Sequence, residues 1–189
     1  MSKGNNQLRI IGGEWKRRQL PFAPIDHLRP TPDRVRETLF NWLMWDIQNA
    51  RVLDLCTGSG ALAFEALSRG AAHVLMIEPQ QEQCKFLRQN IELLQAQNAK
   101  LLCSTAERAL PSLKDEFDLV FLDPPYQLNL WSSFAEAVDP LLKDQGLVYV
   151  EADCRLSDLQ LPSSWQLIKE TKAGKVRAGL FQKTVQSAA

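Results

Sequence analysis

The sequence lacks the features that mark secreted, membrane-spanning and zinc-binding proteins. No apolar run approaches the roughly 20 residues that a membrane-spanning helix needs, and the polar beginning, MSKGNNQLRI, has no signal-peptide apolar segment. The four cysteines (Cys56, Cys84, Cys103, Cys154) show no CxxC spacing, there are only two histidines, and no repeat or low-complexity tract interrupts the 189 residues. We therefore expect a cytoplasmic protein with four reduced thiols, no bound metal and no membrane contact.

The net charge is zero, but the charges are unevenly distributed. Residues 1–36 hold eight lysines and arginines against three acids, which leaves the rest of the chain acidic. A second basic run lies near the C-terminus and comprises Lys169, Lys172, Lys175, Arg177 and Lys183. Clusters of this kind are either solvated surface or contacts for a polyanion, and the sequence leaves both interpretations open.

Strands and helices alternate from residue 51 onward. Apolar strands are expected at 51–56, 73–78, 99–104, 117–123 and 146–152, and helices at 61–70, 80–97, 106–113 and 131–142. Such alternation with fully apolar strands predicts an α/β fold with a mostly parallel sheet and helices on both faces. Two last apolar runs, near 165–170 and 178–185, are separated by a short basic turn and predict an antiparallel edge.

The N-terminal part has a different pattern. LRIIGGEWKRRQL predicts two short strands joined through Gly12-Gly13 as a hairpin. A helix is expected to follow, with Thr31 as N-cap and Pro32 at the first helical position. We therefore divide the chain into a basic hairpin extension, residues 1–30, and a main domain, residues 31–189.

A glycine-rich loop follows the first long strand in VLDLCTGSGALAFEALSRGA. Gly58 and Gly60, together with Ala63, match the dinucleotide-binding pattern. Glu78 ends the next strand, where an acid can bind ribose hydroxyls. Asp54 lies just before the loop, where its charge would oppose a pyrophosphate and favour a cation such as the sulfonium or ammonium of S-adenosylmethionine. We therefore prefer S-adenosylmethionine to NAD as the cofactor.

The segment VFLDPPY ends the strand at 117–123 with an acid, two prolines and an aromatic residue. In a doubly wound sheet Asp123 should lie beside the glycine loop. Asp123 and the Pro124 carbonyl can accept both N–H bonds of a base's amino group, which draws its lone pair out of conjugation. Pro124 and Pro125 make this arrangement rigid, so little reorganisation is needed, and Tyr126 offers a face on which an extruded base can stack.

DPPY resembles the Asp/Asn/Ser-Pro-Pro-aromatic motif of class I amino-methyltransferases. RIIGGEWKRRQL, LRPTPDRVRETLFNWL and GSGALAFEALSRGA extend the likeness, from about residue 8 to 183, to the bacterial guanine-N2 methyltransferases of small-subunit ribosomal RNA. The resemblance implies a Rossmann-like seven-stranded domain with a small N-terminal hairpin extension. It also implies S-adenosylmethionine as methyl donor and one guanine of 16S rRNA, in assembled or assembling small subunits, as target.

The motifs, the charge distribution and the resemblance together indicate which residues form the sites. We expect the cofactor to contact Asp54, Thr57, Gly58, Ser59, Gly60, Glu78, Thr105 and Ala106. Thr105 and Ala106 stand where relatives place an acid or amide beside the adenine, so the Thr105 hydroxyl or the Ala106 N–H is expected there. For RNA we expect Lys16, Arg17, Arg18, Arg29 and Arg34, in a protein that acts as a monomer.

Several residues permit two interpretations. Arg34 and Arg36 either grip RNA or pair with Asp33 and Glu37, and Trp15 either stacks on a base or packs in the hairpin. Cys56 suggests the nucleophile of a carbon-5 methyltransferase, but amino-group chemistry needs no covalent adduct, so loop packing is preferred.

Three other functions compete with the preferred one. A DNA adenine-N6 methyltransferase usually has a sizeable target-recognition region, and only 63 residues follow Tyr126. A protein-glutamine methyltransferase usually begins its motif with Asn and would leave the basic N-terminus unexplained. A NAD-dependent oxidoreductase would have no use for DPPY.

Overall fold

The computed structural model describes residues 6–26, 28 and 30–185. Its centre is a seven-stranded sheet of order β5-β4-β3-β6-β7-β9-β8. The pairs β5-β4, β4-β3, β3-β6 and β6-β7 are parallel, whereas β9 runs antiparallel to both β7 and β8. The strands are β3 (Arg51–Asp54), β4 (His73–Glu78), β5 (Ala99–Cys103), β6 (Phe117–Leu122), β7 (Leu142–Ala152), β8 (Trp165–Ala173) and β9 (Val176–Lys183).

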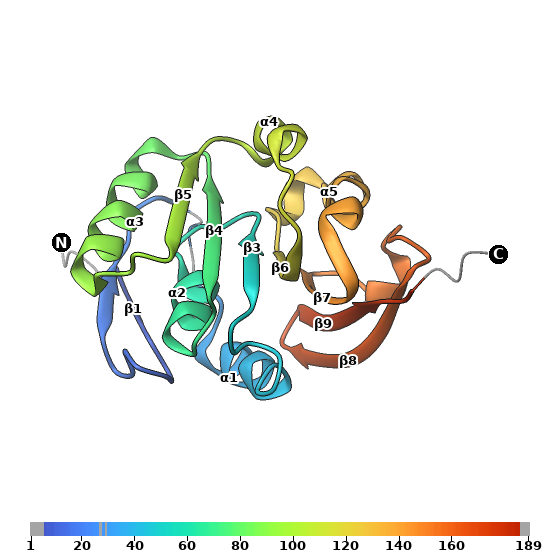
Figure 1. The fold of residues 1–189 in the computed structure, drawn as a ribbon, viewed down its shortest axis with the longest axis horizontal. Helices are drawn as coiled ribbons and strands as arrows, with labels where there is room; N and C mark the ends of the chain where they lie inside the picture. Colours follow the sequence, from blue (N-terminus) through green and yellow to red (C-terminus); the bar gives the residue numbers. More distant parts are fainter. Residues whose placement is uncertain (1–5, 27, 29, 186–189) are drawn as a thin grey trace.

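Helices cover both faces of this sheet, as predicted (Figure 1). One face packs against α1 (Asp33–Trp42), α2 (Ala61–Ser68) and α3 (Gln81–Leu94), and the other against α4 (Ala106–Ala109) and α5 (Trp131–Val138). The first layer is dense because α2 buries all eight of its residues. In the described part of the chain, four 3-10 turns complete the regular structure: Leu110–Ser112, Tyr126–Leu128, Asp139–Leu141 and Leu156–Asp158.

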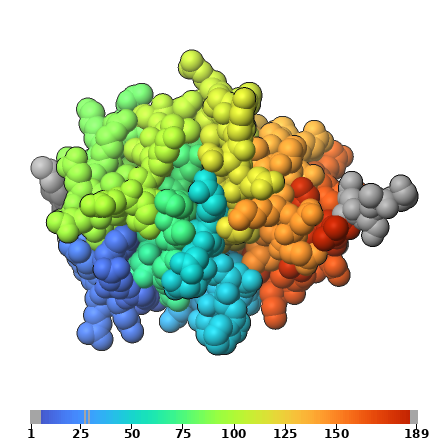
Figure 2. All heavy atoms as spheres, in the orientation of Figure 1, coloured from blue at the N-terminus to red at the C-terminus, as the bar shows by residue number. Residues whose placement is uncertain are grey.

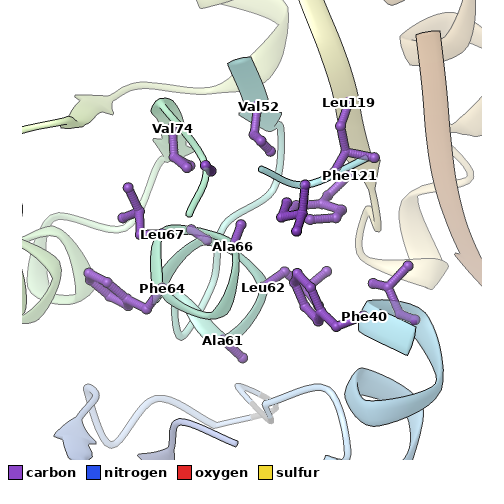
Figure 3. Close-up of a cluster of buried hydrophobic side chains, with 14 of the residues drawn as sticks. Phe40, Val52, Ala61, Leu62, Phe64, Ala66, Leu67, Val74, Leu119 and Phe121 are labelled. Atoms are coloured by element: carbon purple, nitrogen blue, oxygen red, sulfur yellow. The ribbon is translucent and has the colours of Figure 1, made fainter. Parts of the chain in front are cut away.

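The alternation of side chains along the strands separates two cores. In β3, Val52 faces the layer of α1 to α3, and Leu53 faces α4 and α5. Figure 3 shows the first core, where side chains of α2 such as Leu62 lie among those of the sheet and of Phe40 from α1. Phe40 meets Phe121 of β6 edge to face, with ring centroids 6.1 Å apart.

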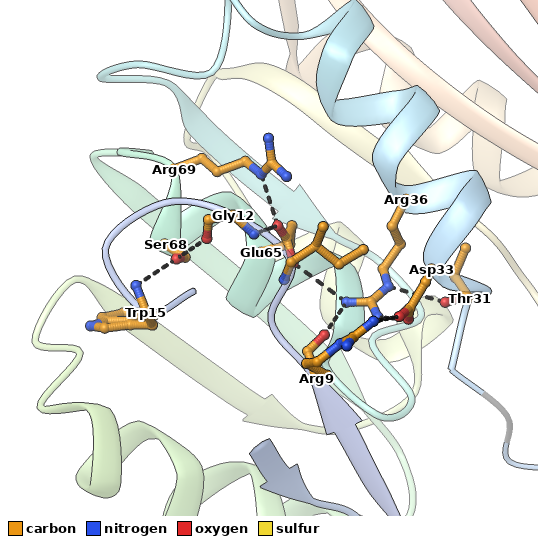
Figure 4. A network of polar contacts seen from close by, with 10 residues as sticks. Arg9, Gly12, Trp15, Thr31, Asp33, Arg36, Glu65, Ser68 and Arg69 are labelled. Atoms are coloured by element: carbon orange, nitrogen blue, oxygen red, sulfur yellow. Dashed lines mark hydrogen bonds and ion pairs between the residues drawn. The ribbon is translucent and has the colours of Figure 1, made fainter. Parts of the chain in front are cut away.

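The predicted hairpin consists of β1 (Gln7–Arg9) and β2 (Gln19–Pro21), which pair antiparallel. Its turn is not a tight Gly12-Gly13 turn, because the whole segment 10–18 connects the strands. This segment folds against α2, where the carboxylate of Glu65 accepts the backbone N–H groups of Ile11 and Gly12 at 2.9 and 2.8 Å (Figure 4). The hairpin thereby shares the core of the sheet, to which it contributes Leu8 and Leu20.

The C-terminal strands form the predicted antiparallel edge, but in an order that sequence did not indicate. β9 inserts between β7 and β8, so the last strand in the chain is not the outermost one. The N-terminal hairpin and this strand pair lie at opposite ends of the molecule (Figures 1 and 2). The basic residues of the hairpin and those of this strand pair are therefore far apart.

The prediction of four reduced thiols was wrong for Cys84 and Cys103, which form a disulfide. Cys84 lies in the first turns of α3 and Cys103 ends β5, with Cα atoms 6.1 Å apart, inside the usual range for such a bond. A separation of 19 residues matches no cysteine motif, and only the packing of α3 beside β5 brings the two together. Cys56 and Cys154 are free.

Within the described ranges, no helix is long and apolar enough to cross a membrane.

Candidate functional site

Four acidic residues meet at the carboxyl edge of the sheet. Glu78 ends β4, Asp54 ends β3, Asp123 directly follows β6, and Glu151 lies near the end of β7. These strands are neighbours in the order β4-β3-β6-β7 and run parallel, so their carboxyl ends lie side by side. All four residues line one cavity of about 660 Å³, which is a common size for the site of a small molecule.

The same cavity collects nearly all the residues predicted from sequence to bind the cofactor or the base. It is lined by Asp54, Thr57, Gly58, Ser59, Glu78, Thr105, Ala106, Asp123, Pro124, Pro125 and Tyr126. Of the predicted residues, Gly60 does not line the cavity; it lies at the N-cap of α2.

The glycine loop between β3 and α2 depends on two left-handed residues. Gly58 has φ of 55° and Gly60 has φ of 86°, which side chains rarely adopt. A Cβ at Gly60 would also lie 2.6 Å from the ring of Phe64 and 2.9 Å from Leu87. Glycine there lets α2 pack tightly, while the loop backbone stays open toward the cavity.

Glu78 fixes the glycine loop from the neighbouring strand. One carboxylate oxygen accepts the N–H of Gly58 at 2.9 Å and the other accepts the N–H of Gln80 at 2.8 Å. Burial raises the pKa of Glu78, and these two hydrogen bonds oppose that rise. Each oxygen retains acceptor capacity for a further donor such as a ribose hydroxyl.

Gln83, which sequence reasoning missed, holds the other side of the loop. It is fully buried, donates to the Gly58 carbonyl at 2.8 Å and accepts the N–H of Ala23 at 2.8 Å. It thus ties the glycine loop to the segment that follows the hairpin. A glutamine five residues after Glu78 on a helix carries no motif, so only the fold identifies it.

Asp54 is a buried carboxylate with an unsatisfied oxygen. It is 3% exposed, one hydrogen bond from the backbone N–H of Ala63 reaches it, and its Oδ2 has no partner among the described residues. Burial, with the nearby charge of Glu78, raises the pKa of Asp54 to about 8. An orphaned buried acceptor of this kind is unfavourable by itself and fits a cationic or N–H-bearing ligand. The site thus suits the ammonium or sulfonium of S-adenosylmethionine.

The segment Asp123–Tyr126 crosses the cavity beside Asp54. Pro124 is buried, and Asp123 and Tyr126 are partly exposed to the cavity. Burial, together with the negative charges of Glu151 and Asp54, raises the pKa of Asp123 well above its usual value. Since carboxylates so close resist ionising together, a cation in the cavity would favour their charged forms.

Glu151 was also missed by sequence reasoning. Its carboxylate accepts hydrogen bonds from the hydroxyls of Tyr126 and Tyr149, each at 2.8 Å. Burial raises the pKa of Glu151, and the two tyrosine hydrogen bonds oppose the rise. An acid ending the apolar run LVYVEA was the available signal, since Glu78 ends its own strand in the same way.

Thr105 and Ala106 line the cavity at the start of α4. Thr105 is the N-cap residue and is exposed, and Ala106 is the first helical residue and is buried. No side-chain bond caps this helix, so its first N–H groups remain available. The prediction that the Thr105 hydroxyl or the Ala106 N–H meets the adenine stays a prediction.

Cys56 lines the cavity but is unsuited to act as a nucleophile. Burial first, and then the charges of Asp54 and Asp123, raise the pKa of its thiol far above the usual value. Because the thiolate is the reactive form of cysteine, the geometry favours the loop-packing interpretation.

The residues predicted to bind RNA lie on the surface, with one outside the described residues. Lys16, Arg17 and Arg18 are exposed in the segment that joins β1 to β2, and Arg34 is exposed on α1. Arg18 contacts the backbone carbonyl of Leu93 at 3.5 Å. The prediction for Arg29 falls outside the residues that the structure describes.

Arg36 and Trp15 have structural roles. Arg36 is 1% exposed and forms ion pairs with Asp33 and Glu65, so it does not face a ligand (Figure 4). Trp15 is partly buried against the core, and its backbone N–H donates to the hydroxyl of Ser68 at 2.9 Å.

No group of three or more histidine, cysteine or acidic residues in the described part of the chain is arranged to hold a metal ion.

Comparison with known proteins matches almost the whole chain. A protein-family model described as Conserved hypothetical protein 95 matches residues 8–182. The Ribosomal RNA small subunit methyltransferase D of Escherichia coli (strain K12) is 40% identical over 185 residues, covering 97% of this chain and 93% of that protein. The protein of that name from Haemophilus influenzae is 39% identical over 182 residues, covering 93% and 94%. A solved structure, a putative methyltransferase yhhF from Escherichia coli, superimposes with a TM-score of 0.88 at 41% identity, covering 95% of this chain and 99% of that one.

Proposed function

The chain belongs to the family of the Ribosomal RNA small subunit methyltransferases D, the class I methyltransferases matched above, and we propose that it methylates a guanine of 16S rRNA. The proposed reaction transfers a methyl group from S-adenosylmethionine to the exocyclic N2 amino group of that base. Assembled or assembling small ribosomal subunits in the cytoplasm are the proposed substrate, and a monomer the proposed active form.

The observation that supports S-adenosylmethionine as the cofactor is the unpaired carboxylate oxygen of Asp54 beside the glycine loop. A buried carboxylate oxygen without a protein partner suits the ammonium or sulfonium of S-adenosylmethionine. Glu78, already aligned by two backbone N–H groups, would hold the ribose hydroxyls. Thr57, Gly58 and Ser59 line the cavity and would provide the loop backbone around the cofactor. S-adenosylmethionine supplies an electrophilic methyl group on its sulfonium.

The residues of DPPY orient the amino group. Asp123 and the Pro124 carbonyl accept its two N–H bonds, so that its lone pair points away from the ring and toward the methyl group. Pro124 and Pro125 hold these acceptors in place before the base arrives. The N–H proton becomes strongly acidic only after methyl transfer, and water can then remove it.

The region after Tyr126 supports an RNA substrate over DNA. Its described residues build α5, β7, β8 and β9, all parts of the central fold. They leave no separate region for reading a DNA target. The exposed Lys16, Arg17 and Arg18 of the hairpin extension, residues 1–30, are the proposed phosphate contacts, with Arg34.

The decisive experiment is methyl transfer from tritiated S-adenosylmethionine to small subunits isolated from cells that lack this enzyme. We expect label in 16S rRNA and N2-methylguanosine on nucleoside analysis, with no label for Asp123→Ala over the same period. Label in N6-methyladenosine or N4-methylcytidine would refute the guanine assignment and retain amino-group transfer. Label on duplex DNA alone would refute the RNA substrate.

A further inference from the structure

We propose that Glu151 is a positioning residue for methyl transfer, because its carboxylate fixes the ring of Tyr126 against which the target base would stack. The inference rests on the proposed function, since it assigns a role on the base side of the same cavity.

The evidence begins with a closed set of contacts around Tyr126. The Tyr126 hydroxyl donates to Glu151 Oε1 at 2.8 Å. The Tyr126 ring stacks on the indole of Trp131, with centroids 5.8 Å apart and planes inclined by 28°. The indole Nε1–H of Trp131 in turn donates to the backbone carbonyl of Glu151 at 2.9 Å. The hydroxyl and the ring of Tyr126 are thus held by Glu151 and Trp131, and the Trp131 indole is itself bonded to the Glu151 backbone.

Glu151 is anchored from the core side. Its other oxygen, Oε2, accepts the hydroxyl of Tyr149 at 2.8 Å. Tyr149 and Glu151 are two residues apart on β7, so both side chains lie on the same face of the strand. Tyr149 is fully buried and packs edge to face on Phe121, with centroids 6.2 Å apart. A rigid core residue therefore contacts the second oxygen of the Glu151 carboxylate, separately from the oxygen that Tyr126 contacts.

Tyr126 needs such an anchor because its own segment offers little support. It begins a 3-10 turn of only three residues, none of them buried, and its neighbours Pro125 and Gln127 are exposed. Trp131 stacks on the ring, and Tyr126 also lines the cavity and is partly exposed, so a base that enters the cavity can reach it. A stacking surface fixed before the base arrives reduces the ordering required on binding and keeps the amino group in line with Asp123.

Labelling of tyrosine rings with ¹³C tests the anchor without any substrate. The chain has only two tyrosines, Tyr126 and Tyr149, so single Tyr→Phe variants assign every ring signal. We expect Glu151→Gln to shift and average the Tyr126 signals, because the stronger carboxylate acceptor is lost. Glu136→Gln, the same chemical change at an exposed residue of α5, should leave them in place. Unchanged Tyr126 signals in Glu151→Gln would overturn the proposal.

Single-turnover methyl transfer to unmethylated small subunits tests the consequence. Glu151→Gln and Tyr126→Phe should each lower the rate about tenfold, the scale of one hydrogen bond to a charged group. The double variant should be no more than about twofold slower than the slower single variant, because both changes break one contact. Cofactor affinity should change much less than the rate, because both Glu151 oxygens already accept tyrosine hydroxyls. Tyr149→Phe, which leaves the Tyr126 contact intact, should lower the rate less.

The outcomes separate this inference from the function on which it rests. Two results would overturn the positioning role alone, provided that the wild-type protein is active. One is a double variant in which the rate losses of the two single variants multiply, and the other is a fully active Tyr126→Phe. A Tyr149→Phe loss equal to that of Glu151→Gln would show that Glu151 serves the core instead. A wild-type protein that transfers no methyl group to small subunits would overturn both.

Discussion

At the scale of single residues, the cavity is defined by carboxylates that no cation in the described part of the chain neutralises. Asp54, Glu78, Asp123 and Glu151 take part in none of the ion pairs found among the described residues. Burial raises the pKa of each of them. Since buried charges are normally paired, this concentration of acids suits a ligand with positive charge and N–H donors.

Asp123 acts either as an acceptor that orients the amino group or as a base, and two substitutions distinguish these roles. Asp123→Ala should lower kcat by about 10²–10³, the scale for losing one preorganised polar contact, and leave cofactor affinity nearly unchanged. Asp123→Asn keeps one acceptor oxygen and should retain clearly more activity than Asp123→Ala. Single-turnover transfer with the three proteins measures this. If the Asn and Ala variants are equally inactive while binding cofactor and subunits, Asp123 acts as a base or through its charge.

At the scale of elements, one buried glutamate joins the hairpin to the sheet domain. Glu65 of α2 is fully buried, receives the N–H groups of Ile11 and Gly12, and pairs with Arg36 at 3.4 Å and Arg69 at 2.8 Å. Arg36 in turn donates to the carbonyl of Arg9 at 2.9 Å. The segment 10–18 therefore stays attached through polar contacts that α2 provides (Figure 4).

Glu65→Gln should destabilise the protein because it removes the charge that two arginines share. Breaking a buried pair from one side costs about 3–5 kcal/mol, which lowers the melting temperature by about 2–4 °C for each kcal/mol in a chain of this size. Glu92→Gln, at an exposed position of α3, is the matched control and should change little. Calorimetric or denaturant unfolding measures both, and equal stability of the two variants would contradict this account.

We expect the segment that joins β1 to β2 to bind RNA through its positive charges. If Lys16, Arg17 and Arg18 each contact a phosphate, changing all three to Ala should reduce the log–log salt slope of subunit binding by about 2, at roughly 0.7 for each contact with a single strand. Changing Lys100, Lys114 and Lys143 to Ala removes the same charge near the amino ends of β5, β6 and β7, at the edge of the sheet opposite the cavity, and should leave the slope unchanged. An identical slope for wild type and the hairpin variant would mean that these charges are only solvated surface.

At the scale of the whole molecule, the acidic cavity links ligand binding to stability. The folded-state pKa values of its carboxyls exceed the unfolded values, so between about pH 4 and 8 the folded protein binds more protons than the unfolded chain. This difference in bound protons stabilises the ligand-free protein at low pH. The stabilisation is lost as the pH rises through this window. A cation bound among the ionised carboxylates reverses the effect.

We therefore expect the melting temperature of the ligand-free protein to fall between pH 5 and 8.5, and to fall less in Asp54→Asn. S-adenosylmethionine should raise the melting temperature, more at pH 8 than at pH 6, and NAD should not raise it. Thermal melting across this pH range measures both effects. Equal stabilisation by NAD would contradict a site for a cationic ligand. So would a rise in melting temperature with S-adenosylmethionine that is independent of pH in both the wild type and Asp54→Asn.

The sequence by itself determined the alternating strands and helices, the hairpin, the glycine loop and the DPPY segment. These are readable because each depends on local chemistry: apolar strands between helices, glycine where the backbone turns left-handed, and proline where a strand must stop. Parallel strands share a carboxyl edge, so Asp54, Glu78 and Asp123 could be expected together before their geometry was known.

Only the tertiary structure decided which residues support that site and where the last strands lie. Gln83, Glu151 and the Cys84–Cys103 disulfide depend on contacts between segments distant in sequence, and no spacing rule encodes such contacts. The apolar patterns of β8 and β9 likewise do not decide which of the two strands pairs with β7, and only the folded sheet shows that it is β9. Local chemistry fixes the elements, whereas long-range packing fixes which of their side chains meet.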